Sequence, residues 1–296
     1  MSTPMTLTRL IESRMSGVAR RAAGLSLVIA AAALGGCVDQ PKPGCISTTN
    51  AFAVKLITVD GPIESAPGAC TGLGPDTFNA LPEIGLSPYY ARGSDGQPDY
   101  ERGSLAVQSA EIGTYFYTAE GFDVANTSGG NIYSLGDFTS AKPGSDNFCN
   151  VPELTPTELV LGALAPVPDD AATEADESFP GQPPVSALLE WSNVRVYVTA
   201  DIFGTQMDGD LVDTRTTATG DTCTYSYRAL GLAPAVSCAA TDADGNPTID
   251  ESLCEPEADI AAGRPLGSGI SPSARFECDP VTRFCLIEGE TVPALR

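Results

Sequence analysis

Cysteine content is the feature that most constrains how this chain can fold. Eight of its nine cysteines lie beyond residue 44, and the chain has no histidine. No two cysteines have the CxxC spacing of a metal site, and no histidine can complete a mixed ligand set, so disulfides are favoured over a metal–thiolate site. An even number of cysteines predicts four disulfides in a chain that is exported to an oxidising compartment, and the first 36 residues, described below, indicate export. The candidate residues are Cys45, Cys70, Cys149, Cys223, Cys238, Cys254, Cys278 and Cys285.

The pairing of these cysteines is not selected by the sequence, because eight cysteines allow many connectivities. Short loops close with the smallest loss of entropy, so we expect local pairs such as Cys45 with Cys70 and Cys278 with Cys285. Each bridge would stabilise the fold by about 2–4 kcal/mol by restricting the unfolded chain.

The first 36 residues have the pattern of a signal peptide. Four arginines precede an uninterrupted run of small and mostly apolar residues at 22–36. A positive segment followed by an apolar segment is typical of secretory signals. The run is shorter than the ~20 residues that a helix needs to cross a bilayer core, so a retained transmembrane anchor is not expected. The arginines are Arg9, Arg14, Arg20 and Arg21.

The signal segment ends in Leu34-Gly35-Gly36-Cys37. At this position the tetrad resembles the lipobox of bacterial lipoproteins. The resemblance implies cleavage before Cys37, diacylglycerol on the Cys37 sulfur and an acyl chain such as palmitate on its amino group. Several acyl chains on one residue hold a protein at a membrane far more firmly than a single myristoyl chain does. The membrane is therefore the partner that we expect, reached through Cys37.

Val38 follows the lipobox cysteine. By resemblance to Gram-negative lipoproteins, a residue other than Asp in this position implies forwarding to the outer membrane. Whether the protein would face the periplasm or the cell surface is left open.

Removal of the signal makes the chain more acidic. The full chain has 16 Lys and Arg against 38 Asp and Glu, and the signal holds four of the basic residues and one of the acids. Residues 37–296 therefore carry 12 basic and 37 acidic side chains, for a net charge of −25. Such a charge disfavours nucleic acid as a partner and favours cationic partners or metal ions.

We expect the mature chain to divide into a short tether at 37–44 and a β-rich domain at 45–296. The stretch 165–184 is acidic and rich in proline, so it forms either a long exposed loop of that domain or a linker between two domains at 45–164 and 185–296. Segments with period-two patterning, typical of strands, lie at 52–60, 104–119, 131–138 and 194–203.

The clearest strand pattern is at 193–202, where apolar residues alternate with polar ones. An expected turn at Asp208-Gly209, a strand at 211–217, a turn at Gly220-Asp221 and a strand at 222–230 would complete an antiparallel meander. Four cysteines then follow among Pro, Gly and Asp residues. We therefore predict an all-β fold, with an antiparallel β-sandwich-like body and a disulfide-rich, loop-rich C-terminal part.

One segment has the spacing of a calcium loop. Asp242, Asp244, Asn246 and Asp250 place oxygen ligands at intervals that suit a hard cation. The match to an EF-hand is incomplete, because Pro247 and Leu253 occupy the positions of its Gly and Glu. The alternative is a plain turn between Cys238 and Cys254. No other cofactor is expected.

Other candidate residues have two interpretations each. Asp208, Asp210 and Asp213 form either a metal cluster or, as we favour, a hairpin turn with solvated carboxylates. The pairs Tyr115/Tyr117 and Tyr225/Tyr227 are expected in strands, each pair on one face, where they would stack on a sugar or peptide or, more simply, pack in the sheet. Trp191 is expected to be a core anchor.

Catalytic motifs do not stand out. Without histidine there is no Ser/His/Asp arrangement, and no Gly-rich phosphate loop follows any expected strand. We therefore expect a lipid-anchored envelope protein of binding or structural type rather than an enzyme, with a protein or glycan partner that the sequence does not specify. The alternative is an envelope hydrolase that uses paired carboxylates.

Overall fold

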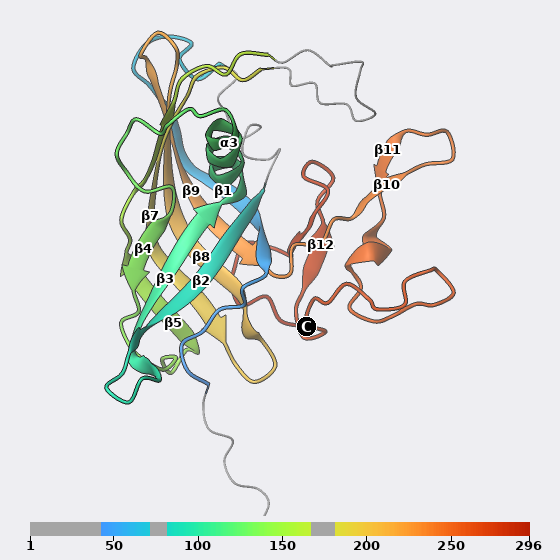
Figure 1. Cartoon of the computed structure of the whole chain (residues 1–296). Coiled ribbons are helices and arrows are strands. Elements are labelled where there is room, and N and C mark those ends of the chain that lie inside the picture. Colours follow the sequence, from blue (N-terminus) through green and yellow to red (C-terminus); the bar gives the residue numbers. More distant parts are fainter. Residues whose placement is uncertain (1–42, 72–81, 167–180) are drawn as a thin grey trace, which may run out of the picture. The chain divides into compact units, whose positions relative to one another are not determined.

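The computed structural model describes residues 43–71, 82–166 and 181–296 (Figure 1). The predicted signal peptide, Cys37 and nearly all of the tether lie outside the described residues, as does most of the predicted loop at 165–184. Within the described ranges, no helix has the length and apolar character needed to cross a membrane.

The body of the protein is one antiparallel sheet of nine strands, which confirms the prediction of an antiparallel all-β fold. The strand order is β4-β3-β2-β1-β9-β8-β7-β5, and β6 also pairs with β7. The strands are β1 (Ala51–Glu64), β2 (Glu83–Arg92), β3 (Pro98–Ser109), β4 (Ser134–Asp137), β5 (Phe148–Glu153), β6 (Thr157–Leu161), β7 (Val185–Val198), β8 (Phe203–Thr216) and β9 (Thr222–Leu232).

The two ends of this sheet approach each other. The amide of Thr139, just after β4, donates to the carbonyl of Asn150 in β5 at 2.9 Å. The side-chain hydroxyls of Ser134 and Thr157 are buried and lie 2.9 Å apart. The body is therefore a single, nearly closed, barrel-like sheet around one hydrophobic core, where the sequence suggested two facing sheets.

Strand β7 shows how the sequence pattern fixes the core. Val194, Val196 and Val198 are buried as predicted, and Trp191 is a core residue with 2% exposure. A register shift between Ser192 and Arg195, with Asn193 at a φ of 50°, moves the buried face from the odd-numbered to the even-numbered positions. Asparagine tolerates this left-handed conformation better than most residues. The bulge explains why a single alternation does not run through the strand.

The predicted meander is present, with one error. The expected strands at 211–217 and 222–230 fall in β8 and β9, and Gly220 forms the turn between them with a φ of +89°. The expected turn at Asp208-Gly209 was wrong, because both residues lie inside β8 and pair with β7 and β9. A Cβ at Gly209 would lie 3.0 Å from a methyl group of Val194, so this glycine makes room for the β7 bulge and does not form a turn.

A helix replaces the second half of one predicted strand. The expected strand at 104–119 ends at Ser109, and α3 (Ala110–Gly121) follows directly. Ile112 and Ala119 are fully buried in the core, and Tyr115 and Phe116 pack against it. These four positions recur with the helical period, which outweighs the strand propensity of the aromatic residues. The expected strand at 131–138 is shortened to β4.

The C-terminal part has little regular structure, as predicted. It contains β10 (Ala239–Thr241), β11 (Pro247–Ile249), the 3₁₀-helix η1 (Glu251–Cys254), β12 (Phe276–Cys278) and β13 (Cys285–Ile287). These strands form two separate two-stranded sheets. A second hydrophobic cluster joins Ile270 and Ile287 of this part to Phe148, Tyr197 and Leu230 of the large sheet.

Strands from both sides of the 165–184 stretch belong to the same sheet. Strand β1 pairs with β9, and β5 and β6 pair with β7. The interpretation of 45–296 as one domain, and the alternative of two, stay predictions about how the chain behaves in solution.

Candidate functional site

Four disulfides join the eight predicted cysteines. They are Cys45–Cys149, Cys70–Cys223, Cys238–Cys278 and Cys254–Cys285. The expected local pairs, Cys45 with Cys70 and Cys278 with Cys285, were wrong. The sheet brings residues that are distant in sequence together, so its formation offsets the entropy that made local loops attractive. Cys278 and Cys285 even face each other across β12 and β13, yet each is bridged to another element.

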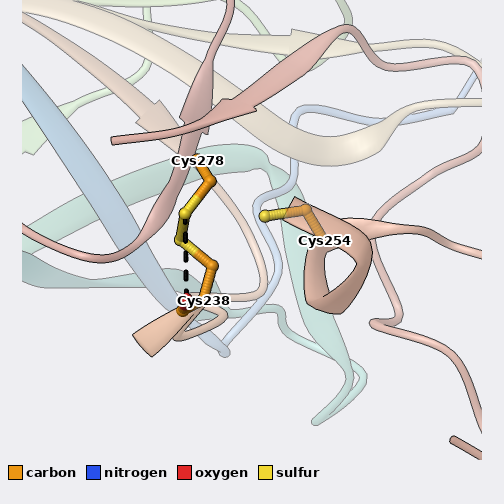
Figure 2. Close-up of side chains that lie close together, drawn as sticks. All are labelled: Cys238, Cys254 and Cys278. Carbon is orange, nitrogen blue, oxygen red and sulfur yellow. Dashed lines mark hydrogen bonds between the residues drawn. A yellow bond between two sulfur atoms is a disulfide. The ribbon is translucent and has the colours of Figure 1, made fainter. Parts of the chain in front are cut away.

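Three sulfur atoms of the C-terminal part gather closely, as Figure 2 shows. The Sγ atoms of Cys238, Cys254 and Cys278 all lie within 4.8 Å of one another, and all three residues are buried. They belong to two neighbouring disulfides. Metal binding by cysteine requires a thiolate, so the cluster is not a metal–thiolate site while both bridges are formed.

A buried ionic network lies between α3 and β8. The Arg215 guanidinium donates to both carboxylate oxygens of Glu111, at 3.1 and 2.8 Å, and to both of Asp213, at 2.6 and 3.0 Å. All three side chains are buried. Because Glu111 is in the first turn of α3, the network ties the start of the helix to the inner face of the sheet.

The electrostatics of this network follow from one cation between two carboxylates. Burial alone would lower the pKa of the Arg215 guanidinium, but the charges and hydrogen bonds of Asp213 and Glu111 raise this pKa above its ordinary value. Burial, followed by the charge of Asp213, raises the pKa of the nearby Tyr227 hydroxyl. The site therefore holds a charged arginine and a neutral tyrosine over a wide pH range.

Of the two tyrosine pairs predicted to share a strand face, one does so in the structure and the other does not. Tyr225 and Tyr227 lie on one face of β9 with their rings stacked, 5.7 Å between centroids, so the packing interpretation is the one that fits. Tyr115 and Tyr117 do not share a face, because they are in a helix and not in a strand. Tyr115 packs against the core, whereas Tyr117 is 61% exposed.

The predicted aspartate cluster is divided between two faces of β8. Asp213 points inward to Arg215. Asp208 is buried on the other face, where it accepts hydrogen bonds from Arg195 and, at 3.1 Å, from Arg228. Neither the expected hairpin turn nor a joint metal cluster is present at these residues. A hollow of about 420 Å³ here is lined by Asn193, Arg195, Asp208, Gly209, Asp210 and Arg228.

The candidate calcium residues form a turn. The Asp242 carboxylate accepts hydrogen bonds from the amides of Asp244 and Asn246, at 2.9 and 2.8 Å. Hydrogen bonds from Asn246 and Asp244 hold the pKa of Asp242 below its ordinary value. Asp250 instead caps η1 by accepting from the amide of Ser252 at 2.9 Å. Calcium binding by Asp242, Asp244, Asn246 and Asp250 stays a prediction.

Two residues of the buried network were not anticipated from the sequence. Glu111 lies in a segment that was expected to be a strand, and its partner Arg215 is distant along the chain. The available signal was the position of Arg215, which falls on the inward-facing alternation of β8 with Leu211 and Asp213. A basic residue on a buried face requires an acidic partner.

Comparison with known proteins places the sheet in a family. The family model described as MlpA matches residues 50–234, from just before β1 to just beyond β9. A protein of Myxococcus xanthus, named "Putative lipoprotein MlpA", is 26% identical over 279 residues, which cover 92% of this chain and 96% of that protein. No solved structure matches this chain. The sequence match spans every strand of the large sheet, and the chain therefore belongs to the MlpA family.

Proposed function

We propose that the protein is a lipid-anchored component of the bacterial envelope that acts as a binding or structural module. The observation that carries the proposal is the tetrad Leu34-Gly35-Gly36-Cys37 at the end of a signal-like segment. The similarity to a protein named as a lipoprotein supports it. On this proposal Cys37 carries the lipid and is the first residue of the mature chain.

The disulfides support an oxidising location. Eight cysteines in four bridges are typical of proteins outside the cytoplasm. Cys37 lies eight positions before Cys45, which is bridged to Cys149 in β5. A fully extended tether of that length reaches about 28 Å. An anchor at Cys37 would therefore hold the large sheet close to the membrane surface.

We further propose the outer membrane as the destination, on the basis of Val38. A Val38→Asp variant tests this point separately from lipidation. It should carry the same lipid as the wild-type protein but fractionate with the inner membrane of a Gram-negative host. Identical outer-membrane fractionation of both proteins would contradict the sorting proposal and leave the anchor intact.

Lipidation itself is tested by metabolic labelling with an alkyne analogue of palmitate. We expect label in the wild-type protein, none in Cys37→Ser, and accumulation of the unprocessed precursor when globomycin is added. A wild-type protein without label, or a labelled Cys37→Ser variant, would refute the proposal.

Whether the purified protein hydrolyses any substrate distinguishes the binding role from the hydrolase alternative. Among the described residues, Glu111 and Asp213 are two carboxylates brought together by the fold, and both accept hydrogen bonds from Arg215. Engaged in this way, they are poorly placed to act as acid and base on a substrate. A screen of the purified mature protein against glycans, peptides and esters should give no turnover, and hydrolysis of any of them would favour the enzyme.

A further inference from the structure

A hollow in the C-terminal part is lined by residues of the two neighbouring disulfides. Its volume is about 280 Å³, and its wall includes Cys254 and Cys278, one cysteine from each bridge. The remaining lining residues are Glu251, Glu255, Phe276, Glu277, Glu288 and Arg296. A small molecule or side chain in the hollow would therefore lie against one cysteine of each of two neighbouring disulfides.

The sulfur atoms are close enough for the two bridges to react with each other. The Sγ atom of Cys254 lies within 4.8 Å of those of both Cys238 and Cys278 (Figure 2). A thiolate attacks a disulfide sulfur directly, so its rate depends on such proximity. Among the described residues, this is the group in which three sulfur atoms are gathered this closely.

The charged residues around the hollow determine whether a cationic or an anionic thiol compound is favoured there. Three of its four glutamates are ion-paired, with N–O distances of 2.7 Å for Lys55–Glu277, 2.8 Å for Arg275–Glu288 and 3.7 Å for Arg296–Glu255. Glu251 has no such ion pair within the described chain and is exposed. Together with the net charge of −25, this favours a cationic thiol over an anionic one.

We propose that this hollow is a thiol–disulfide exchange site for a dithiol partner. One thiolate of the partner attacks Sγ of Cys254, the Cys254–Cys285 bond breaks, and Cys285 leaves as a thiolate that takes up a proton. The second thiol of the partner then displaces Cys254. The partner is oxidised to a disulfide, and the Cys254–Cys285 bridge is reduced to two thiols.

The neighbouring bridge then takes part. The Cys254 thiolate attacks Sγ of Cys278, a Cys254–Cys278 bond forms, and Cys238 is released as a thiolate. This second step consumes no electrons, because one disulfide replaces another. Opening one bridge therefore changes the pairing of both and rearranges the cross-links of the C-terminal part.

The variant Cys285→Ser tests the second step without a reductant. It leaves Cys254 as a thiol beside the intact bridge, so peptide mapping after acid quenching and alkylation should find Cys254 joined to Cys278 or Cys238. The matched control is Cys223→Ser, which leaves Cys70 away from this cluster and should preserve the other three bridges. A fully alkylated Cys254 beside an intact Cys238–Cys278 bridge would overturn the proposal.

A second experiment uses the wild-type protein, in case the variants fail to fold. Under limiting dithiothreitol, Cys254–Cys285 and Cys238–Cys278 should open before the two bridges of the large sheet, with Cys254–Cys278 as an intermediate. Cationic cysteamine should open them about tenfold faster than anionic 3-mercaptopropionate at low salt, and added salt should remove the difference. Earlier opening of Cys45–Cys149 or Cys70–Cys223, or equal rates for both thiols, would refute the site.

Discussion

The large sheet and the C-terminal part are held together by different means. Most of the large, fully buried side chains of the described chain lie between Phe52 and Leu232, in or beside the sheet and α3. The C-terminal part, residues 236–296, buries fewer large side chains, and these, such as Ile270 and Ile287, belong to the second hydrophobic cluster. Its two bridges span only 40 and 31 residues, whereas those of the sheet span 104 and 153.

This difference indicates where each part gains its stability. A sheet that buries large aliphatic and aromatic side chains is stabilised mainly by the removal of apolar surface from water. A segment that buries fewer large side chains depends more on cross-links that restrict its unfolded state. Loss of disulfides should therefore destabilise mainly the C-terminal part, whereas loss of buried apolar residues should destabilise mainly the sheet.

Removal of both C-terminal bridges is expected to have the largest effect. A variant with serine at Cys238, Cys254, Cys278 and Cys285 loses about 2–4 kcal/mol for each bridge. We expect amides of 236–296 to lose protection in hydrogen exchange, while those of β7, β8 and β9 keep it. Simultaneous loss of protection in the sheet would show that the two parts unfold as one unit and would break the comparison.

The buried network of the sheet is the next most sensitive point. Arg215→Met leaves Glu111 and Asp213 buried without their cation, which should cost about 3–5 kcal/mol in the free energy of unfolding. Urea denaturation measures this change. The control is Arg102→Met, which removes an exposed ion pair with Asp99 and should cost less than about 1 kcal/mol. Equal costs would mean that the network contributes no more than a surface pair.

A leucine pair compares a buried side chain of the sheet with an exposed one of the C-terminal part. Leu211 in β8 is 1% exposed, whereas Leu266 in the C-terminal part is 87% exposed. Leu211→Ala should destabilise the protein by about 2–5 kcal/mol because it leaves a cavity. Leu266→Ala should change the stability by no more than about 0.5 kcal/mol. A large effect of Leu266→Ala in thermal denaturation would show that this side chain is packed in the folded protein and would contradict its exposure.

Alkaline pH should weaken the sheet through Tyr227. Burial and the charge of Asp213 raise its pKa in the folded state, while a tyrosine in the unfolded chain ionises near pH ~10. The neutral hydroxyl therefore contributes its full stability below about pH 10, and this contribution is lost as the pH rises toward the folded-state pKa. Stability measured against pH should fall less steeply for Tyr227→Phe than for the wild-type protein. A matching decline in both would assign the effect to other groups.

Local patterns predicted part of the fold well. The alternation in 194–198 and the glycine turn at 220 are set by neighbouring residues, and both are present. The Asp208-Gly209 turn failed because tertiary packing against Val194 placed that glycine inside a strand. The helix at 110–121 was missed because its aromatic residues favour strands when they are considered singly.

Long-range features could not be predicted from the chain alone. The pairing of Cys70 with Cys223 depends on β1 lying next to β9, which places Glu64 opposite Cys223. Likewise, Glu111 of α3 meets Arg215 of β8 only after the helix packs over the sheet, where it contacts β2, β3 and β6. Such contacts form between residues that share no local pattern, so sequence spacing contains no signal for them.

The central claim is that the mature protein begins at a lipidated Cys37 and folds with four disulfides. Intact mass spectrometry of protein extracted from native membranes tests both parts together, with alkylation before and after reduction. We predict a chain of residues 37–296 that carries acyl groups on Cys37 and gains eight alkyl groups only after reduction. A chain that retains residues 1–36 and is alkylated on its cysteines without reduction would contradict the account.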